Sequence, residues 1–435
     1  MSVEVLTILV LVLIFVVGTV RSVNLGVLGL AAAFAVGGLA VGMSAEDLFA
    51  GFPVDLFVAL MGLTFLFGFA QRNGTVDLLV TWGLRLVRGK VAAAPWIFFA
   101  LTGLLMSIGA IFAIACVAPL AIPFARRYKI DQLMMGMMVV HGGMAGAFSP
   151  LSVYGVFVNG FLESRDLPVN TLALFATSFV FNTVIALLVY VTMGGRALFG
   201  RRETITDAPT ADTPSPDASN ADAPNPDAPN PDALRRSNAP TVHQLVTLTG
   251  LAAMVVGTVA FGIDIGILAT TVAAVLAVVN PTDAKESLTH VSWSTVVLVG
   301  GVITYINVLE TAGTVEFTSK AIMELGSPLL AVLLLCYLSG VVSALASSIG
   351  TIGIAVAIAA PLMESGELGV IGVAAALSIA ATVVDVSPFS TNGALVLANV
   401  DADHREAFYQ RMLVYAGLIV LLAPLAAWAF ALMPM

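Results

Sequence analysis

A seven-residue pattern suited to binding a small ion occurs twice in this chain. Residues 149–155 and 387–393 both follow Ser-Pro-x-Ser-x-x-Gly, and they lie 238 positions apart. Each copy interrupts a long apolar stretch, and its proline removes a backbone donor and clashes with the preceding turn of a helix. In lipid, a broken helix is tolerated only where its freed N–H and C=O groups line a cavity or are buried in protein. Two matched breaks therefore predict a binding site near the middle of a membrane.

Two further polar turns, at 107–110 and 347–351, divide long apolar stretches in the same two parts of the chain. Helix N-termini direct N–H groups toward an anion, whereas hydroxyl and carbonyl oxygens suit a hard cation such as Na⁺. The predicted substrate-binding residues are Ser107, Gly109, Ser149, Ser152, Ser348, Gly350, Thr351, Ser387, Ser390, Thr391 and Asn392. The predicted Na⁺ ligands are Ser107, Ser149, Ser347 and Ser387. For any single serine, simple helix packing is the competing interpretation.

Two ionisable residues fall inside the predicted spans, His141 and Asp385. A charge inside the membrane is expensive, so such residues are functional hypotheses by default. Asp385 lies two positions before Ser387 and is predicted to bind a cation or carry a proton; the alternative is a local cap for the helix break. His141 is a second coupling candidate, although a neutral, hydrogen-bonded histidine in the helix packing explains it as well.

The composition is that of a polytopic membrane protein rather than a soluble one. Of the 435 residues, 59% are hydrophobic and 10% are charged, and the mean hydropathy is +1.00. The net charge of −9 argues against a nucleic-acid partner. The sequence contains none of the motifs HExxH, GxSxG and GxxxxGK[ST], and its four histidines show no ligand spacing. We therefore expect neither an enzyme nor a cofactor, apart from Na⁺ as a coupling ion.

The chain reads as two related halves. Asn24-Leu25-Gly26 aligns with Asp264-Ile265-Gly266, and Ser107-Ile108-Gly109 aligns with Ser348-Ile349-Gly350, at offsets of 240 and 241. The fold class is thus predicted as all-α, with two repeats of five transmembrane helices each, one of them broken, plus a hairpin and an interfacial helix over 75–90. The predicted domains are residues 1–200, a linker at 201–240 and residues 241–435.

The linker has a composition that cannot form a packed core. Between 203 and 240, aspartate recurs every five residues among Ala, Pro, Asn and Ser. Such a stretch has almost nothing apolar to bury, and its prolines favour extended, disordered chain. It is predicted to be a tether between the two halves.

The basic residues decide between a re-entrant hairpin and a complete crossing at 92–125 and 328–363. With two re-entrant hairpins the second half is inverted, and every Lys and Arg except Arg165 and Lys320 lies on one side. This distribution fits the positive-inside rule, whereas complete crossings would divide the basic residues more evenly. The predicted topology places the linker in the cytoplasm and both termini outside a cell (inner or plasma) membrane.

The first half resembles a known family. The stretches VNLGVLGLAAAFAVGGLAVGMSAEDLFAGFPVDLF, AQRNGTVDLLV, RLVRGKVAAAPW and MVVHGGMAGAFSPLSVYGV are similar to the N-terminal domain of MatC-type malonate/dicarboxylate carriers. More distantly, the whole chain is similar to the ion-transporter superfamily, which includes the divalent anion/sodium symporters. The hairpin tips of those symporters carry Ser-Asn-Thr, whereas the tips here lack the asparagine.

The resemblance implies a secondary active transporter for a small dicarboxylate, malonate or a C4 acid, coupled to Na⁺ or H⁺. It also implies an elevator-type homodimer in the lipid bilayer with a small anionic substrate. The alternative within the superfamily is a carrier for an inorganic oxyanion or a cation/proton antiporter. Composition and spacing by themselves imply only a carrier for a small, anionic solute.

Overall fold

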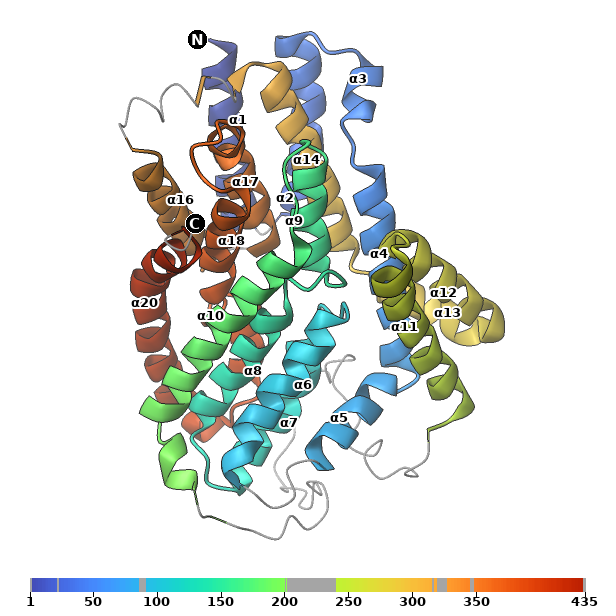
Figure 1. The fold of residues 1–435 in the computed structure, drawn as a ribbon, viewed down its shortest axis with the longest axis vertical. Helices are drawn as coiled ribbons and strands as arrows, with labels where there is room; N and C mark the ends of the chain where they lie inside the picture. The colour runs from blue at the N-terminus through green and yellow to red at the C-terminus, as the bar shows by residue number, and fades with distance from the viewer. Residues whose placement is uncertain are drawn as a thin grey trace.

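The structure is a computed structural model that describes residues 2–21, 23–85, 91–199, 201, 240–314, 317–318, 327–344 and 348–432. Throughout these ranges the regular elements are helices, as the sequence predicts (Figure 1). Ser347, residues 86–90 of the predicted interfacial helix and nearly all of the predicted linker lie outside the described residues.

The first half has the following helices: α1 (Val3–Arg21), α2 (Leu25–Ala32), the π-helix η1 (Ala33–Val41), α3 (Ala45–Ala50), α4 (Val54–Arg72), α5 (Thr75–Arg85), η2 (Val91–Ala93), α6 (Ala94–Ser107), α7 (Ala113–Arg127), α8 (Gln132–Gly146), α9 (Val153–Glu163), α10 (Thr171–Thr192) and η3 (Gly195–Leu198). The second half has α11 (Val242–Phe261), α12 (Ile265–Val279), α13 (Pro281–Thr289), α14 (Trp293–Thr311), α16 (Pro328–Ser343), α17 (Ser348–Glu364), α18 (Val370–Val383), α19 (Thr391–Ala398) and α20 (Ala402–Leu432).

Both predicted helix breaks are present. The first separates α8 from α9, and the second separates α18 from α19. The stretch 92–125 forms the two antiparallel arms α6 and α7, which meet at a turn after Ser107. In Figure 1 the start of α6 and the end of α7 lie together at the bottom of the molecule. The start of α16 and the end of α17 lie in its upper part.

Matched side chains start matched helices in the two halves. Asn24 accepts hydrogen bonds from the backbone at the start of α2, and Asp264 does the same at the start of α12. Such caps satisfy amides that have no partner within the helix. The predicted equivalence of these two positions therefore has a structural counterpart.

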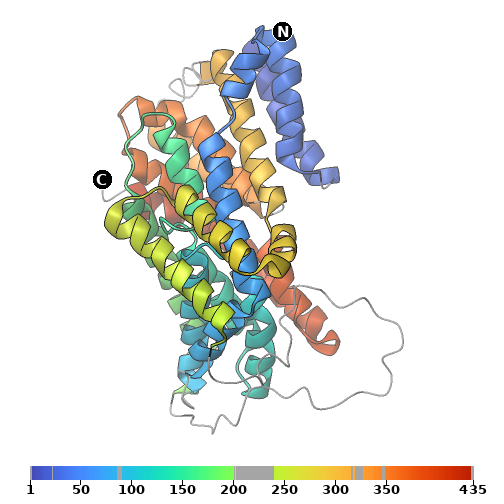
Figure 2. The ribbon, with the colours of Figure 1, turned by 90° about the vertical axis from the view of Figure 1, so that its right-hand side faces the viewer.

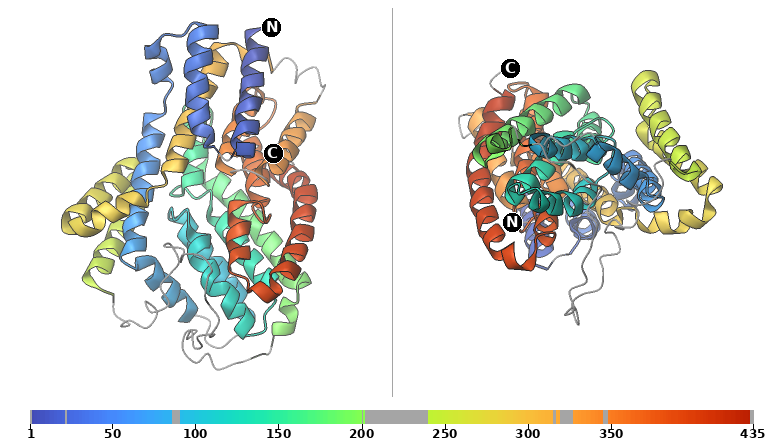
Figure 3. Two further views of the ribbon diagram at one scale, coloured as in Figure 1. Left: turned by 180° about the vertical axis from the view of Figure 1, so that it is seen from behind. Right: turned by 90° about the horizontal axis from the view of Figure 1, so that it is seen from below.

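The helices fall into two groups, which we call the frame (α1–α4 and α11–α14) and the hairpin group (α6–α10 and α16–α20). In the frame, α4 packs on α12, and α14 packs on α2. In the hairpin group, α8 packs on α6, α7 and α10, and α18 packs on α16, α17 and α20. Figure 2 shows α11 and α12 lying across α4, and Figure 3 shows α20 at the outer edge of the hairpin group. The pairings repeat from one half to the other, which supports a duplicated architecture.

Glycines allow the frame helices to touch through their backbones. A Cβ placed on Gly26 of α2 would lie 2.0 Å from the carbonyl oxygen of Val297, and one on Gly301 would lie 1.9 Å from the carbonyl oxygen of Gly26. No side chain fits at those distances, so α2 and α14 pack more closely than any other residue at these positions would permit.

Several helices have the length and polarity of membrane spans. Within the described residues, α4, α10, α14 and α20 are long and apolar enough to cross a bilayer, and shorter apolar helices accompany them. Large apolar side chains on the outer faces of α10 and α20, such as Leu188 and Leu422, are exposed. This protein is a multi-pass membrane protein, and these faces suit contact with lipid.

One sequence alignment is wrong. Ser107 ends α6, the first arm of its hairpin, whereas Ser348 begins α17, the second arm of the other hairpin. The two Ser-Ile-Gly triplets therefore lie on opposite sides of their turns. The better landmark is Gly103 of α6, packed on the carbonyl of Gly142, because Gly340 of α16 approaches the carbonyl of Ala380 in the same way. Offsets of 237 and 238 follow from these contacts, so Ser107 corresponds to a position near Ser343.

Candidate binding site between the hairpins and the helix breaks

A buried carboxylate forms the centre of the candidate site. Asp385 lies in the break after α18, and its Oδ2 accepts hydrogen bonds from Ser348 Oγ at 2.8 Å and Asn392 Nδ2 at 3.1 Å. Ser343 Oγ in turn donates to Ser348 Oγ at 3.0 Å. All four residues are buried, and Asp385 is only 3% exposed. We call these four residues the Asp385 cluster.

Four separate segments supply the Asp385 cluster. Ser343 is the last residue of α16, Ser348 is the first residue of α17, and Asn392 is in the first turn of α19. Asp385 comes from the irregular stretch between α18 and α19. The cluster therefore joins the second hairpin to the second helix break, and it exists only while these two elements are packed together.

The second break has a defined backbone fold. Ser390 Oγ donates to the carbonyl of Ser387 at 2.7 Å and accepts from the amide of Gly393 at 3.3 Å, so it caps α19. A Cβ on Gly393 would lie 1.9 Å from the carbonyl oxygen of Ser387. The chain thus folds back on itself so tightly that only glycine fits, which explains the glycine that ends the repeated motif.

The first break repeats this fold. Ser152 Oγ donates to the carbonyl of Ser149 at 2.8 Å and accepts from the amide of Gly155 at 3.1 Å. A Cβ on Gly155 would lie 2.0 Å from the carbonyl oxygen of Ser149. The two Ser-Pro-x-Ser-x-x-Gly segments therefore have the same capping hydrogen bonds and the same tight approach at their final glycine.

The first break is also attached to its own hairpin. Ser149 Oγ donates to the carbonyl of Ser107 at 2.6 Å. Gly109, in the turn after α6, has a φ of +105°, and a Cβ there would lie 3.1 Å from the carbonyl oxygen of Leu151. The predicted site residues Ser107, Gly109, Ser149 and Ser152 are therefore brought together.

The two breaks differ in the residues that carry charge. Ala147 stands 238 positions before Asp385, and Tyr154 stands 238 positions before Asn392. Tyr154 is buried in the first turn of α9. The first half thus has a phenol where the second half has Asn392, and it has no carboxylate at the position of Asp385.

Some predicted site residues lie elsewhere. Gly350 faces the frame, because a Cβ there would lie 3.1 Å from Leu25 of α2. Thr391 is exposed at the start of α19, whereas Thr351 is buried in the first turn of α17. Gly350, and the exposed Thr391, do not join the Asp385 cluster.

His141 lies in a separate network. Its Nε2 is 2.6 Å from the hydroxyl of Tyr415 on α20, and its Nδ1 is 3.1 Å from Asn182 Oδ1 on α10. Asn182 Nδ2 also donates to the carbonyl of Ser178 at 3.1 Å. The imidazole is fully buried and both of its partners are neutral, so it joins α8, α10 and α20 through hydrogen bonds.

Sequence reasoning missed Ser343, Tyr154, Asn182 and Tyr415. Ser343 would have been found by aligning the hairpin arms on Gly103 and Gly340, and Tyr154 by comparing the two break motifs position by position. Asn182 and Tyr415 carried no local signal, since each lies on a long, mostly apolar helix and belongs to no recognisable motif.

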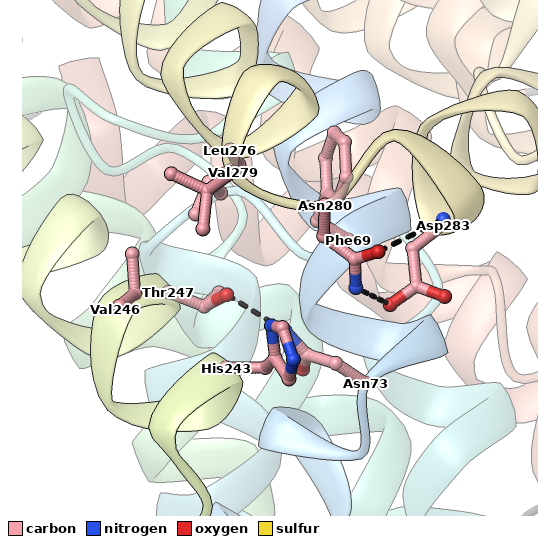
Figure 4. A pocket seen from close by; sticks show the side chains of 9 residues that line it. All are labelled: Phe69, Asn73, His243, Val246, Thr247, Leu276, Val279, Asn280 and Asp283. Atoms are coloured by element: carbon pink, nitrogen blue, oxygen red, sulfur yellow. Dashed lines mark hydrogen bonds between the residues drawn. The ribbon is translucent and has the colours of Figure 1, made fainter.

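A small pocket in the frame is distinct from this site (Figure 4). Its polar side chains bond to one another: Asn73 Nδ2 donates to Thr247 Oγ1 at 2.7 Å, and Asn280 bonds to Asp283. These contacts join α4 to α11 and α12 to α13, which fits a packing role. No group of three or more His, Cys, Asp or Glu within the described ranges is arranged to hold a metal ion.

Comparison with known proteins agrees with the resemblance seen in the sequence. Residues 1–147 match the family model described as the N-terminus of the dicarboxylate carrier protein MatC. Among solved structures, the crystal structure of the Alcanivorax borkumensis YdaH transporter, described as revealing an unusual topology, is similar with a TM-score of 0.57 and 13% identity. The similarity covers 89% of this chain and 89% of that chain. No curated protein matches the chain.

The family match and the structural match support different conclusions. The family match confirms the predicted resemblance to MatC-type carriers for the N-terminal part of the chain. The structural match shows the fold, which is the all-α, polytopic fold of a membrane transporter. The substrate, the coupling ion and the mechanism are matters for the proposal that follows.

Proposed function

We propose that this protein is a secondary active transporter that moves malonate or a C4 dicarboxylate together with Na⁺ or H⁺. The observation that carries the proposal is the Asp385 cluster. Within the described residues, the hydrogen-bond partners of this buried carboxylate are a hydroxyl and an amide group, contributed by a hairpin arm and a helix break. Two neutral donors offset only part of the cost of removing a negative charge from water. A bound cation or proton neutralises the carboxylate and offsets the rest of this cost. Cation binding is thereby linked to the packing of the second hairpin.

Oxygen atoms suited to a hard cation surround the carboxylate. Hydroxyls of Ser343 and Ser348 lie on one side, and the carboxamide of Asn392 lies on the other. Na⁺ binds to carboxylate, hydroxyl and carbonyl oxygens, and a proton needs only the carboxylate itself. The same cluster is thus chemically suited to either coupling ion.

Helix starts and hydroxyls, rather than basic side chains, are proposed to hold the dianion. Helices α8, α9, α17, α18 and α19 contain no Lys or Arg. The backbone amides at the starts of α9 and α17 and the helix dipole favour negative charge there. A bound cation at Asp385 would add a positive charge close to those amides, so that cation and anion each strengthen the binding of the other.

The packing of the hairpins suggests how access could alternate. Each break is attached to the hairpin of its own half, through Ser149 in the first half and Asp385 in the second. The hairpin group can therefore move as one body against the frame, carrying substrate and cation together. This supports the elevator-type mechanism, and the homodimer, as parts of the proposal. Inverted repeats and outward-facing termini belong to the same proposal.

A second candidate is a cation/proton antiporter of the same superfamily. The buried Asp385 favours it, since one carboxylate that binds Na⁺ and H⁺ in turn is sufficient for exchange. The two functions differ in their substrates, because an antiporter needs no organic anion.

Uptake into proteoliposomes tests these alternatives. Labelled malonate and succinate should accumulate under an imposed Na⁺ or pH gradient, and Asp385→Asn should abolish accumulation while leaving the protein folded. Asp264→Asn is the matched control, since Asp264 caps α12 in the frame and asparagine caps equally well. Accumulation by Asp385→Asn at the rate of the unmodified protein would contradict the coupling role. Na⁺/H⁺ exchange without any dicarboxylate uptake would favour the antiporter.

A further inference from the structure

Two groups of three charged residues occupy equivalent places in the two halves, with opposite signs. The first group consists of Glu310 at the end of α14, Arg165 after α9 and Glu364 at the end of α17. The second group consists of Arg72 at the end of α4, Asp401 after α19 and Arg126 near the end of α7. Corresponding members are separated by 238, 236 and 238 positions.

The first group joins the frame to the hairpin group. Arg165 Nη1 forms an ion pair with Glu310 on the frame helix α14 and lies 3.8 Å from Glu364 on α17. Its side chain is 8% exposed and its guanidinium also lies over the ring of Phe161. The ion pair with Glu310 is thus a link between the two bodies that the proposed transport cycle must move apart.

The second group has only half of the equivalent contacts. Arg126 pairs with Asp401 at 2.6 Å, both within the hairpin group, just as Arg165 contacts Glu364. Arg72, the counterpart of Glu310, instead pairs with Glu286 at 2.5 Å, within the frame. The ion pair that would correspond to Arg165–Glu310 is Arg72–Asp401. This pair is absent from the ion pairs of the described residues.

We infer that Arg72 and Asp401 form the ion pair of the opposite transport state, which replaces the Arg165–Glu310 pair when the hairpin group moves. In a transporter built from inverted repeats, alternating access is largely a rigid-body movement of one bundle against the other, so each repeat can take the arrangement that the other now has. In each group the central residue is opposite in charge to the other two, and all three charges are reversed between the groups. This inference rests on the proposed function as a transporter with two access states.

The pairs within the hairpin group, Arg165 with Glu364 and Arg126 with Asp401, give Arg165 and Asp401 a partner throughout the exchange. When Glu310 separates from Arg165, Glu364 remains beside the guanidinium on the same body. When Asp401 reaches Arg72, Arg126 is already its neighbour. Removing the sole partner of a buried charge is strongly unfavourable, and a second carboxylate beside Arg165 avoids that cost.

Cross-linking of cysteine pairs in membrane vesicles tests the exchange. Arg165→Cys with Glu310→Cys should link in one state, and Arg72→Cys with Asp401→Cys should link in the other, using a short bifunctional thiol reagent. A protein with all four substitutions should carry one link or the other, never both in one molecule. The native Cys116 and Cys336 are buried, and the corresponding single-cysteine variants provide the background.

A charge reversal shifts the population between the states. Glu310→Arg places a like charge beside Arg165, so the yield of the Arg72→Cys/Asp401→Cys link should rise several-fold. Glu367→Arg is the control, since this exposed glutamate near the end of α17 should leave the yield unchanged. Both links in one molecule, or no Arg72→Cys/Asp401→Cys link in a folded Glu310→Arg protein, would overturn the inference. The links report on structure alone, so exchange of links without dicarboxylate uptake would contradict the proposed substrate and leave this inference standing.

Discussion

Ser348, the first residue of α17, donates a hydrogen bond of 2.8 Å to Asp385, 37 positions further along the chain. This bond joins the second arm of a hairpin to a broken helix. It makes the position of the hairpin depend on the charge state of one carboxylate, because Ser348 stabilises the ionised form by donating to it.

Ser348→Ala should change cation binding at Asp385 without unfolding the protein, in a direction that depends on the ion. The Ser348 hydroxyl stabilises the ionised carboxylate by about 1.5 kcal/mol, so its loss should lower the half-saturating H⁺ concentration about tenfold if H⁺ is the coupling ion. If Na⁺ is the coupling ion, the loss of a ligand oxygen should raise the half-saturating Na⁺ concentration. Uptake measured against cation concentration checks this. Ser365→Ala is the control, since Ser365 donates to the carbonyl of Leu362 and accepts from the amide of Glu367 at the end of α17, away from the Asp385 cluster. An unchanged half-saturating concentration for Ser348→Ala would remove Ser348 from the cation site.

Gly393→Ala should destabilise the protein severely. Its Cβ would meet the carbonyl oxygen of Ser387 at 1.9 Å, and a backbone atom held by a capped turn has no room to move. We expect a loss of about 3 kcal/mol or more, measured as thermal inactivation of the purified protein. Gly417→Ala on α20 is the matched control, because no atom lies within 4 Å of its added Cβ. Equal stability of the two variants would contradict the tight turn.

Tyr415→Phe tests whether His141 is structural. The substitution removes the partner of His141 Nε2, at 2.6 Å, but leaves the ring packing. A structural network predicts a loss of about 1 kcal/mol in stability with no change in the pH dependence of uptake. A shift in that pH dependence would instead support His141 as a second coupling residue.

Cysteines introduced at Glu46 and Asp222 should react with impermeant reagents from opposite sides of the membrane. Glu46 is exposed on α3, and Asp222 belongs to the predicted linker outside the described residues. The distribution of Lys and Arg predicts that Asp222 faces the cytoplasm. Reaction of both cysteines from one side would contradict the inverted topology.

Shortening residues 203–240 to a flexible tether that still spans the gap should change the uptake rate less than about twofold. The physical reason is that the aspartate/proline period offers no apolar face for packing. A folded but inactive deletion would show that the linker takes part in transport. A full-length linker with the same composition in scrambled order is the control, because it changes the sequence of the linker but keeps its length.

The breaks and helix starts could be predicted because their signals are local. Ser149-Pro150 and Ser387-Pro388 break helices by the chemistry of proline, and Asn24 and Asp264 cap helices through their own side chains. The match of the two break motifs in hydrogen bonding follows directly from their shared residues. The Asp385 cluster was reachable from the sequence only in part, since Asp385, Ser348 and Asn392 were predicted but Ser343 was not.

The rest depends on contacts between distant segments. The misplaced Ser-Ile-Gly equivalence arose because identical letters occur on different arms of the two hairpins, and only packing shows which arm faces which helix. The partners of His141 lie on α10 and α20, 41 and 274 positions away. The link from Arg165 to Glu310 likewise joins residues whose proximity no local pattern indicates.

The occurrence of Asp385 in one half only, with Ala147 at the equivalent place in the other, has an electrical consequence. A dicarboxylate carries two negative charges, whereas one carboxylate binds one monovalent cation. Each turnover would then move one net negative charge across the membrane, so the voltage would act on the loaded hairpin group as well as the concentration gradients. An inside-negative potential would slow uptake, and the protein would respond to the energised state of the cell as well as to its supply of substrate.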